Sequence, residues 1–291
     1  MKALVTGAGG FVGSHLVREL RDAGWRVLTS DRRGDVDLPG DLLKLPLRSI
    51  SVDVVFHLAG FANPSASISD PSDAWTGNAV ATARVAREVR ARRLVIASTG
   101  QVYGPRSDRP SESAPVSPRT PYAASKLCGE ALALSSSREV VILRPYNHTG
   151  PGQSDAYVCP WIARQIARAE AGRGPRVVTV GALEPRRDFF DVRDMARAYR
   201  LAAEKARPGE IYNVATGRPV RIGDVLRLLV AESRVPLSVR TGHGAADLMS
   251  GDPSKFRRHT GWRPEIPLPR TLRDLLDYER EKTGSLSSKI E

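Results

Sequence analysis

The sequence predicts an α/β fold in which a doubly wound parallel sheet is followed by a smaller α/β lobe. Over residues 1–150, short apolar runs alternate with amphipathic helical patterns, as in parallel sheets whose strands are joined by helices. After residue 150 the chain becomes richer in proline and glycine, which marks a change of architecture. We therefore expect one domain mainly from residues 1–150, a second lobe mainly from residues 151–283 with some exchange of chain between them, and a polar tail at 284–291.

The individual elements follow from hydrophobic periodicity. Runs of three to seven residues rich in valine, isoleucine and leucine indicate strands, and apolar residues three or four positions apart indicate helices. The expected strands are 3–5, 26–29, 52–58, 93–97 and 140–143. The expected helices are 13–23, 79–92, 125–134, 161–171 and 192–204.

Composition excludes several classes of protein. Hydrophobic residues make up 41% of the chain and charged residues 26%, which is typical of globular domains, and no apolar run approaches the length of a membrane span. Cys128 and Cys159 lack the paired spacing of a disulfide framework or a cysteine zinc site, so we expect no metal. The opening MKALVTG has no signal-peptide core, which favours a cytoplasmic location without membrane association.

The net charge of +12 raises the question of a nucleic-acid partner. The arginines are dispersed through helical stretches instead of forming one block, and aromatic residues, at 6%, offer few platforms for stacking on bases. We therefore expect a solvated arginine-rich surface and no nucleic-acid partner. Steering of a small phosphate-bearing molecule is the alternative.

A glycine-rich segment, residues 6–13, stands between the first strand and the first helix. Gly7 and Gly10 let the backbone turn tightly and approach a pyrophosphate, Gly13 lets helix and strand pack closely, and the helix N-terminus attracts the anion. In this context the motif predicts a Rossmann-type domain that binds a dinucleotide.

The second strand runs into Asp31, about 20 residues after the glycines. A carboxylate at this position can accept hydrogen bonds from the hydroxyls of the adenosine ribose, which slightly favours NAD. Arg32 and Arg33 follow directly and could pair with a ribose 2′-phosphate, so NADP remains open.

Tyr122 and Lys126 stand four residues apart, which places both on one face of a helix. A nearby cation favours the phenolate, so Lys126, together with an oxidised nicotinamide, is expected to lower the pKa of Tyr122. Thr99 follows an apolar strand, at whose carboxyl end a ligand binds in a parallel sheet. The three side chains form a candidate catalytic group for proton exchange on a substrate oxygen.

Several motifs together carry a resemblance to a known family. They are residues 6–13, His57-Leu58-Ala59-Gly60, Asn78, residues 98–104, residues 122–126 and Arg144-Pro145-Tyr146-Asn147. The chain resembles the extended short-chain dehydrogenase/reductase superfamily, which modifies sugar nucleotides. Its later motifs, at 144–153, 184–194, 251–255 and 261–264, are similar to those of GDP-4-keto-6-deoxymannose reductases, which form GDP-rhamnose, and of the neighbouring GDP-mannose 4,6-dehydratases.

The resemblance implies NAD or NADP as cofactor, a nucleotide sugar as substrate, and homodimerisation through two helices of the first domain. It implies Thr99, Tyr122 and Lys126 as the catalytic group. The implied cofactor-binding residues are Gly7, Gly10, Phe11, Val12, Asp31, Arg32, Asp41, Leu42, Leu58, Ala59, Gly60, Asn78, Tyr122, Lys126 and Pro145. The implied substrate-binding residues are Gln101, Asn147, Arg187 and Arg218.

Gln101 narrows the reaction that the resemblance implies. The 4,6-dehydratases carry an acid at this position and the fucose-type epimerase-reductases carry a cysteine, whereas an amide transfers no proton. The favoured activity is therefore NAD(P)H-dependent reduction of the 4-keto group of a nucleotide-activated deoxysugar. A sugar-nucleotide 4-epimerase or a dehydratase is the nearest alternative, and a non-catalytic dinucleotide-binding sensor is a remote one.

One departure from the family concerns the anchor of the substrate diphosphate. Relatives carry an arginine in an Arg-Pro-Ala-Asp run, where this chain has Gly244-Ala245-Ala246-Asp247. His243 could substitute, although a histidine in a loop is more often merely solvated.

Overall fold

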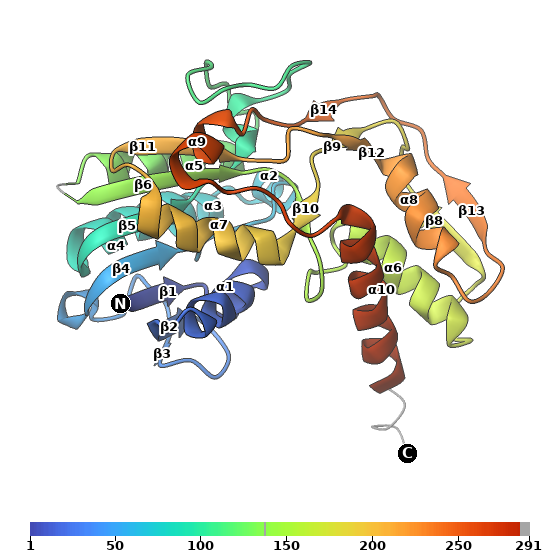
Figure 1. Cartoon of the computed structure of the whole chain (residues 1–291), viewed down its shortest axis with the longest axis horizontal. Coiled ribbons are helices and arrows are strands. Elements are labelled where there is room, and N and C mark those ends of the chain that lie inside the picture. Colours follow the sequence, from blue (N-terminus) through green and yellow to red (C-terminus); the bar gives the residue numbers. More distant parts are fainter. Residues whose placement is uncertain (137, 286–291) are drawn as a thin grey trace.

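The computed structural model describes residues 1–136 and 138–285 (Figure 1). Its main sheet has seven strands in the order β11-β6-β5-β4-β1-β2-β3, and all neighbouring pairs are parallel. The strands are β1 Lys2–Thr6, β2 Arg26–Asp31, β3 Leu38–Pro39, β4 Ser51–His57, β5 Arg90–Ala97, β6 Glu139–Pro145 and β11 Glu210–Val214. The fold is thus the expected Rossmann-type doubly wound sheet. Its strand order reverses between β1 and β4, where ligands bind in such sheets.

Helices cover both faces of this sheet. On one face α1 (Phe11–Asp22) and α7 (Val192–Lys205) lie side by side (Figure 1). On the other are the π-helical turn η2 (Trp75–Val80), α4 (Ala81–Glu88) and α5 (Pro121–Leu134). The inner strands are apolar on both faces, as a covered parallel sheet requires. In β1, Ala3 and Val5 belong to the core beneath α1 and α7, and Leu4 belongs to the core on the other face of the sheet.

The second lobe packs three helices around small strands. α6 (Val158–Glu170), α8 (Ile222–Ala231) and α10 (Leu268–Ser285) share an apolar core with β8 (Val177–Val180), which pairs with β13 (Ser238–Thr241). Two short sheets join the lobes, β12 (Val220–Arg221)–β9 (Arg186–Arg187)–β14 (Leu248–Met249) and β7 (His148–Thr149)–β10 (Phe190–Asp191). The remaining short elements are η1 Leu47–Ser49, α2 Ala66–Ser69, α3 Ser72–Ala74, η3 Gly100–Tyr103 and α9 Ser254–Thr260.

The helix expected at 192–204 does not belong to the second lobe. It forms α7, whose buried side chains, among them Met195 and Tyr199, pack with those of α1, and β11 then extends the main sheet beyond β6. Sequence periodicity shows that a helix has an apolar face, but not which apolar face it meets. Chain after residue 150 therefore returns to the first domain. Of the expected tail, residues 284–285 end α10, and 286–291 lie outside the described residues.

Several helix boundaries also differ from the expectation, among them the start of α6 at Val158 instead of 161. The helix expected at 79–92 is α4, which continues from η2 at Ala81 and ends at Glu88, because Val89 is extended and Arg90 pairs with Ser51 of β4. The helix expected at 125–134 begins at Pro121, where the Thr120 hydroxyl accepts a hydrogen bond from the Ala123 amide at 3.2 Å. This earlier start places Tyr122 in the first turn of α5.

In the part of the chain that the structure describes, no helix combines the length and the apolar character needed to cross a lipid bilayer. Within residues 1–136 and 138–285 there is also no group of three or more histidine, cysteine, aspartate or glutamate side chains able to hold a metal ion.

Candidate active site

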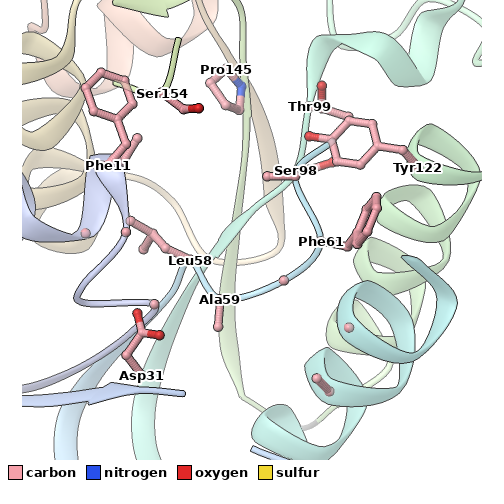
Figure 2. A pocket seen from close by; sticks show the side chains of 18 of the residues that line it. Phe11, Asp31, Leu58, Ala59, Phe61, Ser98, Thr99, Tyr122, Pro145 and Ser154 are labelled. Atoms are coloured by element: carbon pink, nitrogen blue, oxygen red, sulfur yellow. The ribbon is translucent and has the colours of Figure 1, made fainter. Parts of the chain in front are cut away.

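A cleft of about 570 Å³ opens at the carboxyl end of the main sheet, between the two lobes. Its walls come from the glycine loop, the end of β2, the loop after β4, the segment after β5, the start of α5 and the segment between β6 and α6. Figure 2 shows Phe11 and Asp31 on one side of this cleft and Thr99 and Tyr122 on the other.

The glycine loop forms a cradle that side chains would fill. Gly7 has a φ of +74°, and a Cβ on it would lie 2.7 Å from the Ala59 nitrogen. A Cβ on Gly13 would overlap the Gly7 carbonyl oxygen. No side chain caps the N-terminus of α1, so its first amides are open to an anion. These features fit the pyrophosphate of a dinucleotide.

Asp31 ends β2 at the rim of the cleft. Its Oδ2 accepts a hydrogen bond from the Gly9 amide at 3.0 Å, so the carboxylate lies against the glycine loop, where a ribose would follow the pyrophosphate. Arg32 and Asp41 also line the cleft, and their side chains form an ion pair at 3.5 Å. The guanidinium beside Asp31 therefore already has a partner.

Most of the expected cofactor-binding residues line this cleft. They are Gly7, Gly10, Phe11, Val12, Asp31, Arg32, Asp41, Leu42, Leu58, Ala59, Gly60, Tyr122 and Pro145. Asn78 does not line it. Its buried side chain accepts a hydrogen bond from the Phe61 amide at 2.9 Å and donates to Ser125 at 3.0 Å, so it ties the loop after β4 to α5.

Thr99 and Tyr122 meet at the floor of the cleft. Their side chains interact, and Thr99 Oγ1 accepts a hydrogen bond from the Gln101 amide at 3.2 Å. Burial raises the pKa of Tyr122 to about 12, with the bond to Thr99 opposing that rise. The phenol is therefore protonated at neutral pH, as a proton donor has to be.

Lys126 lies one helical turn beyond Tyr122 and does not line the cleft. Its Nζ donates to the Ala97 carbonyl at 3.0 Å, and burial lowers the pKa of Lys126 to about 8. The expected lowering of the Tyr122 pKa by Lys126 is not observed, because burial dominates and the ammonium donates to the Ala97 carbonyl at the end of β5.

The expected substrate residues divide into two groups. Gln101 and Asn147 line the cleft, and Asn147 Oδ1 is buried there without a hydrogen-bond partner. Arg187 does not line it, because its guanidinium forms a two-pronged ion pair with Asp247 at 2.8 and 2.9 Å. Arg218 is exposed on the loop after β11, also away from the cleft lining.

The cleft also contains residues that sequence reasoning did not select. Phe61, Tyr146, Ser154, Tyr157 and Met249 line it. The Tyr157 hydroxyl donates to the Ala62 carbonyl at 2.9 Å and so joins the lobes across the cleft. Tyr146 lies within the Arg144–Asn147 motif that the sequence analysis identified, whereas no periodicity or motif spacing identifies Tyr157 or Met249 as a cleft residue.

A cleft at the switch point of a doubly wound sheet, with a glycine cradle and a threonine–tyrosine–lysine group, defines a dinucleotide-dependent oxidoreductase of the short-chain type. Residues 3–215 match the model of the NAD dependent epimerase/dehydratase family, to which the chain belongs. The protein is accordingly an NAD(P)-dependent enzyme of that family.

The comparisons identify relatives with several reactions. The chain is 34% identical to a GDP-6-deoxy-D-mannose reductase of Pseudomonas aeruginosa, over 96% of this chain and 97% of the relative. It is 30% identical to a UDP-glucose 4-epimerase of Azospirillum brasilense, over 98% and 94%. Among solved structures, RMD from Pseudomonas aeruginosa complexed with NADPH matches with a TM-score of 0.87 and 32% identity, over 97% of this chain and 99% of the other. MoeE5 in complex with UDP-glucose and NAD matches with a TM-score of 0.87 and 29% identity, over 97% and 100%.

Proposed function

We propose that the protein reduces the 4-keto group of a nucleotide-activated deoxysugar with NADPH or NADH. The observation that carries the proposal is that Thr99 and Tyr122 meet in a cleft where Gln101 supplies neither an acid nor a thiol. The similarity to a GDP-6-deoxy-D-mannose reductase supports it.

The side chains act on the carbonyl oxygen of the sugar. Tyr122, protonated at neutral pH, donates its proton to that oxygen, and Thr99 hydrogen-bonds the same oxygen. A reduced nicotinamide, with its dinucleotide held by the glycine cradle and Asp31, would supply the hydride to the carbonyl carbon. One hydride and one proton convert the ketone to an alcohol, and Tyr122 regains its proton from solvent. Lys126, held at the end of β5, keeps a positive charge below this group.

We place the sugar nucleotide between Gln101 and Asn147, since the unpartnered Asn147 Oδ1 can accept a hydrogen bond from a substrate hydroxyl. For Arg187 to reach a diphosphate, its guanidinium has to leave Asp247. The expected roles of Arg187 and Arg218 in substrate binding therefore require a side-chain movement on binding.

An assay of cofactor oxidation tests the reaction. The purified protein is incubated with GDP-4-keto-6-deoxymannose and either NADPH or NADH, with dTDP-4-keto-6-deoxyglucose as the comparison substrate. We expect absorbance at 340 nm to fall and a GDP-deoxyhexose to form. The protein is an epimerase instead if it interconverts UDP-glucose and UDP-galactose without added cofactor and oxidises no NAD(P)H on either ketone.

The position of Asp31 predicts the preference between the two cofactors. Replacing Asp31 by alanine removes the charged acceptor beside the glycine loop and should weaken NADH binding about tenfold, with a smaller effect on NADPH. Titration of protein fluorescence with each dinucleotide measures this. Asp35→Ala, an exposed position outside the cleft lining, is the control. Equal losses for both cofactors would contradict the assignment.

We also propose a cytoplasmic homodimer that binds no nucleic acid. Exposed apolar side chains support the dimer: Trp75 and Val80 on η2 and Leu132 on α5 are 42%, 53% and 39% exposed, and η2 packs against α5. Light scattering should give twice the mass of the chain. The double variant Val80→Lys/Leu132→Lys should give a monomer, whereas Val239→Lys, equally exposed on the second lobe, should remain dimeric. A monomeric wild-type protein would contradict the dimer.

A further inference from the structure

A buried ion pair lies beneath the catalytic group. Glu130 of α5 and Arg144 of β6 are only 2% and 3% exposed. Arg144 donates from Nε to Glu130 Oε1 at 2.9 Å and from Nη2 to Oε2 at 2.6 Å, and its Nη1 donates to the Tyr103 hydroxyl at 2.9 Å. Removing two charges from water costs free energy even when they pair this completely, so two apolar side chains of similar size would stabilise the fold as well.

The ion pair is connected to the end of β5. The Ser98 hydroxyl donates to Glu130 Oε1. Ser98 stands between Ala97, whose carbonyl accepts from Lys126, and Thr99, which bonds Tyr122. Figure 2 shows Ser98 and Thr99 beside the Tyr122 ring. Glu130 thus holds the short segment that carries Thr99 and that the side chains of Lys126 and Tyr122 contact.

Glu130 also lies one helical turn beyond Lys126 on α5. The ionisable groups that act on Lys126 or feel its charge are Glu130 on α5 and His57 on β4, and Tyr122 lies one turn before it. The pKa of His57 is lowered to about 3 by burial and by Lys126, so this ring is neutral. Tyr122 is also neutral at ordinary pH, so of these groups Glu130 is the one whose charge favours the ammonium form of Lys126.

We propose that Glu130 is a positioning residue for the catalytic group. Through Ser98 it fixes the strand end that carries Thr99 and the Ala97 carbonyl to which Lys126 donates, and it places a carboxylate one helical turn from Lys126. The expected effect on turnover rests on the proposed function, whereas the effect on Lys126 is a property of the cofactor-free chain.

The test follows the titration of Lys126 directly. The cofactor-free protein is labelled with an amine-acylating reagent across a pH series, and the peptide that contains Lys126 is quantified by mass spectrometry. Glu130→Gln should lower the midpoint of Lys126 labelling by about one pH unit, because a negative neighbour is replaced by a neutral one while Arg144 keeps its charge. The alkaline limb of kcat/KM should move to lower pH in the same variant.

A matched control separates this effect from general destabilisation. Glu170 and Arg280 form an equally two-pronged pair, with both contacts at 2.7 Å, in the second lobe. Glu170→Gln should leave the Lys126 midpoint unchanged. Ser98→Ala should lower kcat about tenfold without moving that midpoint, since it removes one hydrogen bond and no charge.

Each outcome decides the proposal. An unchanged Lys126 midpoint in Glu130→Gln overturns it. If that variant does not fold, the double variant Glu130→Gln/Arg144→Met replaces it, because it leaves no unpaired buried charge. It should still lower the midpoint of Lys126 labelling, by a smaller amount, because it removes the carboxylate that lies on the same helix as Lys126. A lowered midpoint in a protein that reduces no 4-keto sugar would reject the proposed function and leave the positioning role intact.

Discussion

The Tyr122→Phe variant is expected to lose turnover by a factor of about 10²–10⁴, the usual contribution of a positioned general acid. The change removes the phenol hydroxyl that contacts Thr99 and keeps the ring that lines the cleft wall. Dinucleotide affinity should therefore stay within about threefold of the wild-type value, because the glycine cradle and Asp31 are untouched. Single-turnover reduction of the keto sugar and fluorescence titration with NADPH measure the two quantities separately.

Tyr157→Phe is the matched comparison. Tyr157 is a second phenol on the same cleft, but its hydroxyl donates to the Ala62 carbonyl and not to Thr99. Its loss should cost less than about tenfold in kcat, the scale of one hydrogen bond. If Tyr157→Phe impairs turnover as severely as Tyr122→Phe, or more so, the proton donor has been assigned to the wrong phenol.

The features that could be predicted from the sequence are those that local chemistry determines. The glycine spacing requires a strand, a tight turn and a helix in succession, and the structure has β1, the cradle and α1 in that order. The end of β2 places Asp31 at the rim of the cleft, because parallel strands end at a common edge. Thr99 and Tyr122 meet, although they are 23 positions apart, because α5 connects β5 to β6 and begins at the edge of the sheet where β5 ends.

The features that could not be predicted depend on contacts between segments that are far apart in the sequence. The apolar face of α7 is equally suited to either lobe, and only the packing against α1 decides. Arg187 is of the type that binds diphosphates, but its direction is set by Asp247, which is 60 positions away. The four-residue spacing correctly predicted that Lys126 lies near Tyr122. Burial, however, has the larger effect on the pKa of the Tyr122 phenol, and burial depends on the folded chain.

The Gly13→Ala variant should be less stable than the wild type and should lose at least about tenfold in dinucleotide affinity, since overpacking of a tight contact costs about 1–3 kcal/mol. The added Cβ would overlap the Gly7 carbonyl oxygen and lie 2.9 Å from the Ala8 Cα. The atoms that would have to move belong to the backbone of the cradle.

Helix propensity alone predicts that Gly13→Ala is more stable than the wild type, so this variant distinguishes propensity from overpacking. Gly13 lies inside α1, where alanine is favoured over glycine by about 1 kcal/mol. Thermal unfolding and dinucleotide titration therefore decide between the two effects. Gly181→Ala, where a Cβ would meet nothing within 4 Å, is the control and should leave both quantities unchanged. A Gly13→Ala protein that is more stable and binds normally would show that close approach of α1 to the glycine loop is not what the motif requires.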